Sequence, residues 1–498
     1  MDMVTNIPLF TIVLSLFSGV LCMILGGKTA RRYTIIYECL LIIAVSAVFA
    51  YTMRTGTSFT YTMGEFPAPW GNEIRAGILE SAIALLFLLV QFCSVLGGFH
   101  FVDLDLDESK INLYYSLINL MTAALMAMTW TNDIFSSYVF IEILTLTSCG
   151  VLIVREIGRT TLAAVRYMIM NLLGSGLFLL GIVLLYDVTG HLLMVPMREE
   201  IQILAQDPGA FTVITLAVGI ITIGLGIKSG LFPFHYWMPD TYGWATPTSG
   251  SLMSSLVSKC YIFILIKIYW RVVGIEVFEQ MHIRTILLVL GMCGIVLGSV
   301  SALHARNVNQ MVAFSSAAQI GYIYMGIGIG GVAGFTAAIF HIAAHAVTKS
   351  MLFLTTPRLA AVSGNSLLFR ELQGSGIRDK NAGVFFTVSG LSMIGIPIFA
   401  GFSSKLLFGI AAVSSGSARK MVLVMLVLAV SSMLNAFYFV RTLIRIYTKE
   451  KKTYTSRPVR HRVSYNIPML LLTAANLALG LASGPVVDVI ERGLAMFV

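Results

Sequence analysis

Long runs of apolar residues, separated by short polar stretches, recur from one end of the chain to the other. A helix of about 18 or more such residues is long enough to cross ~30 Å of hydrocarbon. Lipid cannot hydrogen-bond the backbone, so these runs must form helices or the strands of a closed barrel. Barrel strands alternate apolar and polar residues over about ten positions, and these runs do not alternate. The sequence therefore predicts an all-α integral membrane protein with about fourteen transmembrane helices, near residues 7–26, 33–53, 77–100, 112–130, 133–154, 161–186, 211–238, 246–270, 283–304, 308–330, 333–356, 382–412, 420–445 and 465–490.

Two of the predicted spans are interrupted in the middle. The seventh contains Gly230 and Pro233 in GIKSGLFPFHYWMPD, and the twelfth contains Gly395 and Pro397 in GIPIFAGFSSK. Proline removes a backbone donor and clashes with the preceding turn, so both spans are expected to be broken helices. Broken helices at membrane depth mark ion sites in transporters.

The two interruptions lie five spans apart, which predicts an internal repeat. A unit of five spans crosses the membrane an odd number of times, so a second copy inserts upside down. Spans 4–8 and 9–13 are therefore predicted to form two inverted five-helix repeats. The predicted parts are an N-terminal three-helix segment (1–110), a first half-channel repeat (111–271), a second inverted repeat (282–448), and a basic cytoplasmic loop with a C-terminal helix (449–498).

Composition and charge agree with a membrane protein and predict its orientation. Hydrophobic residues make up 57% of the chain and charged residues 11%, against about 25% charged in soluble domains. Most of the 33 lysines and arginines fall in loops on one side of the predicted spans, and the positive-inside rule assigns that side to the cytoplasm. We therefore expect a multi-pass protein of the cell's inner (plasma) membrane with both termini outside the cytoplasm. A nucleic-acid partner is not expected, because the basic residues form no soluble face.

Motifs for cofactors and metals are not found in the sequence. The six cysteines are scattered singly through apolar spans, without the spacing of a disulfide framework, a zinc site or an iron–sulfur cluster. The sequence also has no Gly-rich phosphate loop or dinucleotide fingerprint. We expect no cofactor, no metal and no redox centre in this chain.

Charged residues inside the spans are the candidate functional groups. Lys267 lies near the end of its span and is expected to extend toward the interface. Deep within the spans the sequence places four lysines and an acid, with Glu80 and Glu38 in two further spans; the deep residues are Glu142, Lys228, Lys259, Lys349 and Lys405.

Four deep lysines outnumber the nearby acids, so they cannot all form structural ion pairs. A charge at the bilayer centre costs at least ~2.5–3.5 kcal/mol, and such residues usually face a bundle interior or a water-filled path. Burial disfavours the charged form of a lysine, and a neighbouring carboxylate favours it. A lysine held between these two influences can load and release a proton when a neighbour moves. A proton relay is therefore preferred to a set of static ion pairs.

Three histidines lie in the same regions and are candidate members of the relay. His235 is beside the first interruption, and His341 and His345 precede Lys349 at intervals of four residues. That spacing puts these last three side chains on one helix face, and histidine exchanges protons near neutral pH. Packing is the alternative role for each histidine. Metal binding by His341 and His345 would need a third ligand, and none adjoins them in sequence.

These residues occur in motifs that resemble a known family, the antiporter-like membrane subunits shared by respiratory complex I, Mrp-type Na⁺/H⁺ antiporters and membrane-bound hydrogenases. The resemblance runs from about residue 60 to 415 and is closest to the D-like branch of the Mrp antiporters and to the N-like or M-like branches of complex I. The segments that carry it, in order, are FPAPWGNEIRAGILESAIALLF, NDIFSSYVFIEILTLTS, AVRYMIMNLLGSGLFLLGIVLLYDVTG, KSGLFPFHYWMPDTYGWATPTSGSLMSSLVSK, HIAAHAVTKSMLFLTT and IPIFAGFSSK.

The resemblance implies a role for each deep charge. It implies that Glu142 modulates Lys228 in a first half-channel and that Lys259 links the two halves. Lys349 and Lys405 would complete the second half-channel.

Two departures from the family pattern stand out. Where the tenth span usually opens with a charged Asp-x-Lys-Arg cluster, this chain has Asn307, Asn309 and Gln310. Some relatives also carry Glu at the position of Lys405.

Three functions remain open on the sequence alone. The leading hypothesis is a proton-translocating subunit of a multi-subunit redox-driven complex, similar to complex I or an energy-converting hydrogenase. The first alternative is a D-like component of an Mrp-type Na⁺/H⁺ antiporter without electron transfer, and the second is a solute permease. The expected partners are other membrane subunits of the same complex, the lipid bilayer and H⁺, with Na⁺ added in the Mrp-type case.

Overall fold

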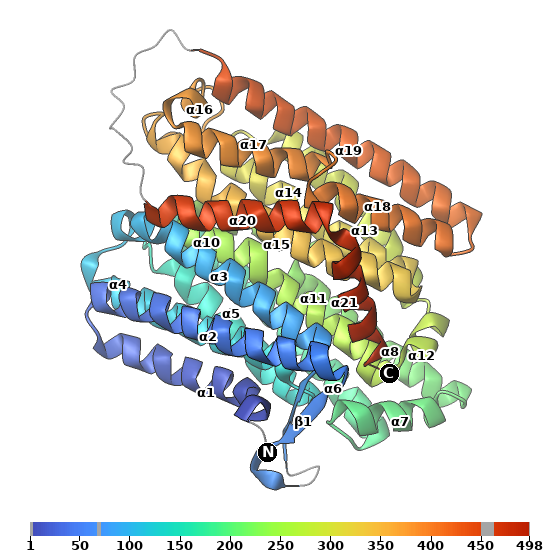
Figure 1. Cartoon of the computed structure of the whole chain (residues 1–498). Coiled ribbons are helices and arrows are strands. Elements are labelled where there is room, and N and C mark those ends of the chain that lie inside the picture. Colours follow the sequence, from blue (N-terminus) through green and yellow to red (C-terminus); the bar gives the residue numbers. More distant parts are fainter. Residues whose placement is uncertain (1–2, 67–70, 450–462, 498) are drawn as a thin grey trace.

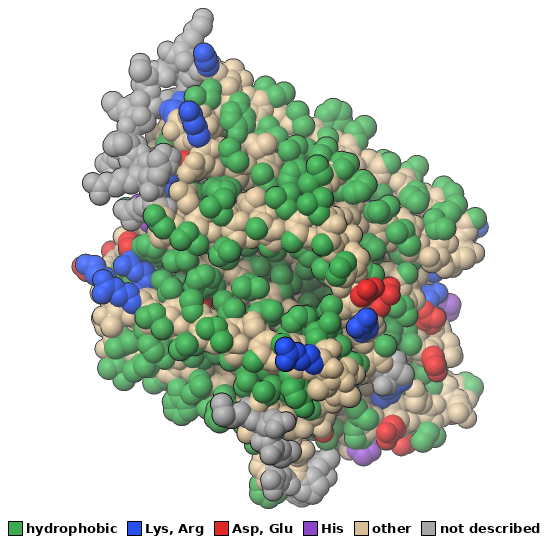
Figure 2. Space-filling model, in the orientation of Figure 1, with side chains coloured by type: hydrophobic (Ala, Val, Ile, Leu, Met, Phe, Trp, Pro, Cys, Tyr) green, Lys and Arg blue, Asp and Glu red, His purple; other side chains and the backbone are tan. Residues whose placement is uncertain are grey.

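The long helices lie alongside one another in one membrane-type bundle (Figure 1). The computed structural model describes residues 3–66, 71–449 and 463–497. Within these residues, thirteen helical stretches are long and apolar enough to cross a membrane. Figure 2 shows that hydrophobic side chains dominate the flank of the bundle, as a surface in contact with lipid requires. The all-α membrane fold predicted from the sequence is confirmed.

Besides the last span, described below, ten of the crossings in the described residues are made by single helices. Each runs without a break between its bounds, and none of them carries Pro233 or Pro397. They are α1 (Met3–Ile24), α2 (Gly27–Thr55), α3 (Ile78–Asp105), α4 (Ile111–Trp130), α5 (Ile134–Ile153), α6 (Gly158–Thr189), α13 (Ile283–His304), α14 (Val308–Ile329), α15 (Gly331–Ala361) and α19 (Ala418–Tyr447).

The seventh and twelfth crossings are broken, as the sequence predicts. In the seventh, α8 (Pro208–Ser229) ends at Gly230, whose φ of +81° is left-handed, and the chain continues as η3 (Phe234–Trp237) and α9 (Met238–Trp244). In the twelfth, α17 (Lys380–Ile394) ends at Gly395, with φ +91°, and α18 (Ala400–Ser414) follows. Glycine tolerates this conformation without a steric penalty. Each break therefore combines a glycine that ends the helix with a proline that prevents it from continuing.

The sequence predicts about fourteen crossings, whereas thirteen helical stretches of the described residues are long enough to cross a membrane. The second break accounts for the difference. Each half of the twelfth crossing has 15 residues, too few to cross the membrane as a single helix. The last predicted span (465–490) is also shorter than expected. It consists of α20 (Val463–Leu481), and the chain then turns into a separate helix, α21 (Ser483–Ala495).

The eighth crossing has an irregularity that the sequence does not reveal. It runs as α10 (Pro247–Leu252), η4 (Met253–Val257), α11 (Ser258–Lys267) and η5 (Ile268–Val273), and both η4 and η5 are π-helical. π-Helical turns are rare and often occur at functional sites. Every residue from 247 to 273 is buried, so this crossing forms the centre of the bundle.

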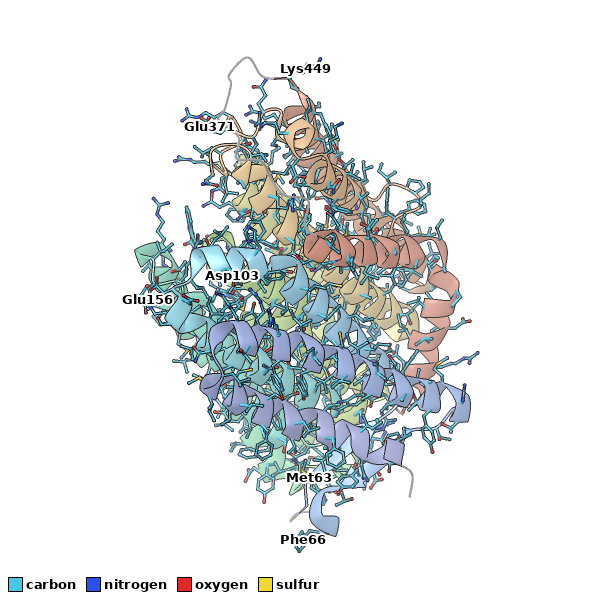
Figure 3. The ribbon with its side chains drawn as sticks, turned by 60° about the vertical axis from the view of Figure 1, so that its left-hand side comes forward. Met63, Phe66, Asp103, Glu156, Glu371 and Lys449 are labelled. Atoms are coloured by element: carbon cyan, nitrogen blue, oxygen red, sulfur yellow. The ribbon has the colours of Figure 1, made fainter. Side chains whose placement is uncertain are left out.

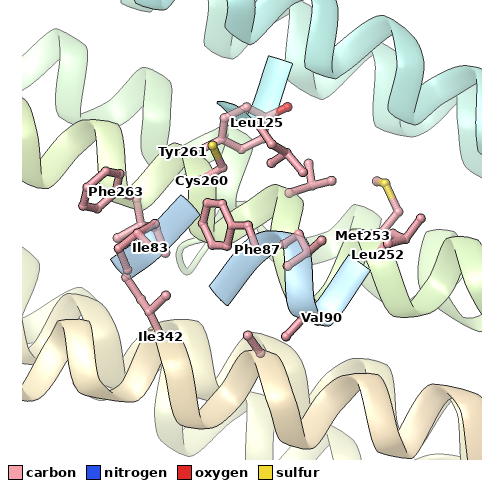
Figure 4. Packing of buried hydrophobic residues seen from close by; sticks show 14 of the residues in the cluster. Ile83, Phe87, Val90, Leu125, Leu252, Met253, Cys260, Tyr261, Phe263 and Ile342 are labelled. Atoms are coloured by element: carbon pink, nitrogen blue, oxygen red, sulfur yellow. The ribbon is translucent and has the colours of Figure 1, made fainter. Parts of the chain in front are cut away.

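Other helices pack tightly around this centre. In Figure 4, Phe87 of α3 lies close to Cys260 of α11, and Val90 of α3 lies on the side toward α15. α14 and α15 are also almost wholly buried, whereas α1, α2 and α6 bury well under half of their apolar stretches. The eighth, tenth and eleventh crossings are thus enclosed by helices that face lipid.

Short elements lie at the ends of the bundle. Strands β1 (Phe59–Thr62) and β2 (Glu73–Ala76) form an antiparallel hairpin in which Phe59 pairs with Ala76. Figure 1 places both chain ends at the same end of the helices as this hairpin, and Figure 3 places Met63 there as well, opposite Asp103. The remaining short helices are η1 (Met63–Glu65), η2 (Glu108–Lys110), α7 (Met194–Leu204), α12 (Ile275–Gln280) and α16 (Ser375–Arg378).

Helices α13 and α14 approach each other closely through glycines. A Cβ atom on Gly321 would lie 2.7 Å from the carbonyl oxygen of Gly291 and 2.7 Å from the amide nitrogen of Ile295. A Cβ on Gly328 would lie 2.3 Å from the amide nitrogen of Leu288. Small residues that let backbones approach in this way are a main source of helix association in lipid.

We predict that Gly321→Leu separates α13 from α14 and destabilises the protein by roughly 1–3 kcal/mol, the usual range for overpacking. Gly176→Leu is the matched control, because a Cβ at this helical glycine meets nothing within 4 Å. The measurement is the unfolding temperature of the purified protein in detergent. Equal unfolding temperatures for the two variants would contradict the prediction.

Candidate functional site

Lys228 and Glu142 form the first part of the site. Lys228 lies in the last turn of α8, just before the break, and its side chain is fully buried. Its Nζ lies 3.4 Å from Glu142 Oε1 and donates a hydrogen bond of 2.8 Å to Thr145 Oγ1, both on α5. Glu142 also accepts a hydrogen bond from the hydroxyl of Ser175. The break thus leaves a charged lysine at the carbonyl end of a half-helix, where the helix dipole favours a cation.

Tyr261 connects this pair to the eighth crossing. Its hydroxyl lies 3.2 Å from Thr145 Oγ1, and its ring centroid lies 5.4 Å from Lys228 Nζ. Tyr261 is two residues from Lys259 on α11. The phenol and the threonine hydroxyl therefore lie between the first lysine and the central lysine.

Lys259 is the central lysine and contacts the π-helical turn that precedes it. Its ammonium group donates to the carbonyl oxygen of Ser254 in η4. The Ser254 hydroxyl in turn lies 2.9 Å from the Ser316 hydroxyl of α14. Lys259 is fully buried, and in the described part of the chain no carboxylate lies within ion-pair distance of it.

Lys349 is held by α14 in a similar way. Its Nζ donates to Val312 O at 2.8 Å and to Ser315 Oγ at 2.5 Å. Ser315 adjoins Ser316 on α14. The Ser315 hydroxyl bonds Lys349 directly, and the Ser316 hydroxyl bonds Ser254, whose carbonyl oxygen holds Lys259. Lys349 also lacks a carboxylate partner among the residues that the structure describes.

His345 and His341 continue from Lys349 along one face of α15. Their ring centroids lie 5.9 Å apart, and His341 Nδ1 lies 2.7 Å from Ser404 Oγ of α18. Within the described residues, both ring nitrogens of His345 and Nε2 of His341 have no hydrogen-bond partner. Both rings are buried, so three polar atoms face the bundle interior without a protein partner.

Lys405 lies at the second break. Its Nζ donates to Ile394 O, the last carbonyl of α17, at 2.7 Å, and to Ser432 Oγ of α19 at 2.9 Å. The ring of Tyr322 lies 6.0 Å from the same Nζ and 5.2 Å from the ring of His341. Lys228 precedes the first break in sequence, whereas Lys405 follows the second break. Nevertheless, each lysine lies at the carbonyl end of the half-helix before its break, which is α8 for Lys228 and α17 for Lys405.

His235 is placed apart from this group. It lies on η3 with its ring 5.7 Å from the ring of Phe232 and 5.5 Å from that of Tyr236. None of its described contacts is with a lysine of the site. Pro233, by contrast, does lie in the break as predicted, and Pro397 lies in the second break.

Lys267 does not extend to the interface, which corrects the sequence-based expectation. It is fully buried, and its Nζ donates to Thr131 O at 2.5 Å and to Thr129 O at 3.0 Å. The physical reason is that η5 continues the eighth crossing to Val273, so Lys267 lies more than a turn inside it. Lys267 follows Lys259 by eight positions, a spacing that places both side chains on one helix face. This spacing was the signal in the sequence that Lys267 points into the bundle as Lys259 does.

Two arginines that fall just outside the predicted spans 77–100 and 246–270 are also buried beside Lys267. Arg75 pairs with Glu80, and its Nη2 donates to Met496 O at 2.5 Å. Arg271 Nε donates to Asn132 Oδ1 at 2.9 Å. Both guanidinium groups face the ring of Phe497, at 5.5 and 5.8 Å. Residues after α21 therefore cover this cluster.

The uncharged opening of the tenth span has a structural role. Asn307 caps α14 by accepting a hydrogen bond of 2.8 Å from Gln310 N. Asn309 is buried and accepts a hydrogen bond of 2.6 Å from Thr356 Oγ1. Neutral amides suit these two positions, since a buried charge would need a partner.

Metal binding has no support in the described residues. No group of three or more His, Cys, Asp or Glu side chains is arranged to hold a metal ion there. The six cysteines are free.

A membrane bundle with two broken helices, a buried lysine at the first break and a half-buried lysine at the second defines the class of ion-translocating membrane proteins with discontinuous helices. The family described as NADH:quinone oxidoreductase/Mrp antiporter, transmembrane, matches residues 131–434. The chain belongs to this family.

Relatives from both branches of the family align along most of the chain. NADH-quinone oxidoreductase subunit N of Desulforudis audaxviator is 29% identical over 513 residues, covering 99% of this chain and 99% of that protein. The D subunit of the Na⁺/H⁺ antiporter of Bacillus subtilis is 25% identical, covering 90% of this chain and 88% of the relative. A chain of the archaeal membrane-bound sulfane sulfur reductase shares the fold with a TM-score of 0.88 at 24% identity, covering 99% of this chain and 98% of that one.

We predict that Gly395→Ala impairs ion transport through Lys405. An added Cβ would lie 3.0 Å from Lys405 Cδ and 3.2 Å from its Nζ, so the ammonium group would be displaced from Ile394 O. Gly416→Ala is the matched control, because Gly416 also has a left-handed φ, of +68°, but a Cβ there meets nothing within 4 Å.

Both substitutions should lower stability by about 1–2 kcal/mol through the same backbone strain. Only Gly395→Ala should lower transport by the assembled complex. The measurements are the unfolding temperature and ion transport in vesicles, and equal transport by both variants would refute the role given to Lys405.

Proposed function

We propose that the chain is the proton-translocating, antiporter-like subunit of a multi-subunit redox-driven membrane complex. The observation that carries the proposal is a row of four lysines, of which Lys228, Lys259 and Lys349 are fully buried. Lys228 alone has a carboxylate within ion-pair distance among the described residues. A buried ammonium group held only by neutral oxygens is easily discharged when its surroundings change. Such a group is suited to pass a proton rather than to hold helices together.

The contacts support one order of proton transfer. Separation of Glu142 from Lys228 would release the proton of Lys228 toward Tyr261 and Lys259. Lys259 donates to the carbonyl oxygen of Ser254, and the Ser254 hydroxyl bonds Ser316 of α14. The neighbouring Ser315 accepts a hydrogen bond from Lys349, so α14 is the element through which a proton would pass from one lysine to the other.

The second half of the path follows α15. His345 and His341 lie between Lys349 and Ser404, which adjoins Lys405. Neutral imidazole both accepts and donates protons, so the two rings suit transfer between these lysines. His235 lies away from this path, and we assign it to packing at the first break.

Partner subunits are expected at the flank near Glu142. The side chain of Glu142 is 25% exposed in the isolated chain, although it lies midway along a membrane-spanning helix. A carboxylate facing lipid is strongly disfavoured. A neighbouring membrane subunit that covers Glu142 would remove this penalty and could move the charge during turnover. Electron transfer is assigned to partner subunits, and this chain supplies the path for protons.

The second candidate is a component of an Mrp-type antiporter, favoured by the likeness to the D subunit of the Bacillus subtilis Na⁺/H⁺ antiporter. Sodium prefers oxygen ligands with negative charge. Glu142 is the single acid in the described path, so the path suits protons, and Na⁺ exchange would depend on another subunit.

The orientation and the repeats are part of the proposal. Both termini would lie outside the cytoplasm, because they share one end of the bundle with the β1–β2 hairpin (Figure 1) and the basic loops favour the other end.

The two breaks, each of which begins at a glycine of positive φ, support repeats at 111–271 and 282–448. The flanking parts would be the three-helix segment 1–110 and the basic loop and C-terminal helix of 449–498, of which 450–462 and 498 lie outside the described residues.

The test is proton uptake by vesicles that contain the intact purified complex. Lys228→Ala and Glu142→Ala should each lower uptake by on the order of a hundredfold or more, the range for removing a proton-transfer group. Lys28→Ala is the control, since Lys28 is exposed and pairs only with exposed Glu108. Uptake is measured once with the electron donor of the complex and once with a sodium gradient. Uptake driven by the electron donor supports the redox-driven complex, and uptake driven by the sodium gradient supports the Mrp-type antiporter. Normal uptake by both variants in an assembled complex would refute the relay.

A further inference from the structure

Glu38 is a second buried carboxyl, and the path described above does not use it. It lies on α2 and is 0% exposed. In the described part of the chain, its one hydrogen bond is accepted by Oε1 from Gln91 Nε2 of α3 at 3.0 Å, while Oε2 has no partner. No Lys, Arg or His of the described residues forms an ion pair with it. This side chain is therefore a membrane-embedded acid with a single neutral donor.

Among the residues that the structure describes, no cation adjoins Glu38 to stabilise a negative charge. The titratable side chains whose charges interact with it are Tyr37, Cys39, Cys93 and Tyr115. Burial of an ionised carboxylate without a counter-charge is far less favourable than burial of the neutral acid. A neutral acid needs an acceptor for its O–H, and Gln91 Oε1 is buried without a partner. The local chemistry therefore suits a carboxylic acid that carries its proton.

A triangle of hydroxyls lies between α3, which carries Gln91, and the helices of the central lysines. Ser94 lies one turn after Gln91 on α3, and its Oγ is 2.8 Å from Ser251 Oγ of α10 and 3.0 Å from Ser350 Oγ of α15. Ser251 also donates to Ser350 at 3.0 Å, which closes a triangle of three hydroxyls from three helices. Ser350 adjoins Lys349 in sequence.

The triangle also lies one helical turn before the residue that binds Lys259. Ser254 follows Ser251 by three residues, so both lie on one face of the eighth crossing, and Ser254 O accepts the hydrogen bond of Lys259. Close packing makes the contact with α3 possible, because a Cβ on Gly98 would lie 2.0 Å from Thr248 Oγ1 of α10. Figure 4 shows the inner face of α3 at Phe87 and Val90 directed toward these helices.

We propose that Glu38 is an additional proton-binding site, connected to the central lysines through Gln91, Ser94 and Ser251. It would give the N-terminal three-helix segment a lateral branch that stores or delivers a proton. This inference rests on the proposed function, since the branch needs a path to join. The competing role is structural: an acid–amide bridge that joins α2 to α3 and, through the Gln91 hydrogen bond to Thr122 of 2.5 Å, to α4.

Infrared difference spectroscopy of the intact complex tests the first step. The C=O stretch of a protonated carboxylic acid should be present in the resting complex, shift in deuterated water, and disappear in Glu38→Gln. Glutamine keeps the bond to Gln91 and should preserve folding, which the unfolding temperature checks. A spectrum that is unchanged by Glu38→Gln would overturn the proposal.

Proton uptake in vesicles tests the connection. Glu38→Gln and Ser94→Ala should each lower uptake by about tenfold, less than the roughly hundredfold or greater loss from a group directly on the path. Glu38→Asp, which keeps a carboxyl, should restore part of the loss. Ser116→Ala is the control, because it removes a buried hydroxyl of α4 that bonds to Gly19 O, away from the branch.

Each pattern of results leads to a different conclusion. Loss of the infrared band with normal uptake in Glu38→Gln means a structural bridge and overturns the branch. Loss of uptake in Lys228→Ala but not in Glu38→Gln keeps the proposed function and also overturns the branch. Loss in Glu38→Gln and Ser94→Ala alone, with normal uptake in Lys228→Ala, refutes the lysine path and therefore also overturns the branch that is proposed to join it.

Discussion

The low polarity of the membrane interior is the constraint on which the rest of the structure depends. A lysine in this interior must find oxygen atoms within the chain, because lipid offers none. Regular helices hold their carbonyl groups in their own hydrogen bonds, so such oxygens become available where helices end or deform. Lys405 bonds the last carbonyl of α17, at Ile394, and Lys259 bonds the carbonyl of Ser254 in a π-helical turn. The second break and the π-helical turn thus each supply a carbonyl oxygen to a lysine.

Neutral partners also explain why the same arrangement suits transport. An ammonium group held by a carboxylate is stable as a charged pair, whereas one held by carbonyl and hydroxyl oxygens loses its proton more readily. The structure has the first kind of contact at Glu142 and Lys228, and the second kind at Lys259 and Lys349. The acid lies at the flank of the bundle and the unpaired lysines lie in its centre. A neighbouring subunit acting on Glu142 could thus change the charge of the whole row.

Much of this could be predicted from the sequence, and the failures have physical causes. The breaks were predictable because Pro233 and Pro397 occur inside apolar runs, where proline prevents a regular helix. Burial of Lys267 was missed because the π-helical turn η5, which continues the crossing beyond Lys267 to Val273, has no sequence signal. The contacts of Lys349 with α14 and the triangle of hydroxyls around Ser94 join segments far apart in sequence, so periodicity within one helix could not reveal them.

The central claim is that the lysines of the two halves form one continuous path. The most direct measurement is proton uptake by the intact complex with Lys228→Ala, Lys405→Ala and the double variant, each normalised to the amount of assembled complex. A continuous path predicts that each single substitution abolishes uptake and that the double variant loses nothing further. Two independent channels would give about half of the uptake in each single variant and none in the double variant, by simple additivity of separate sites. That additive result would contradict the account.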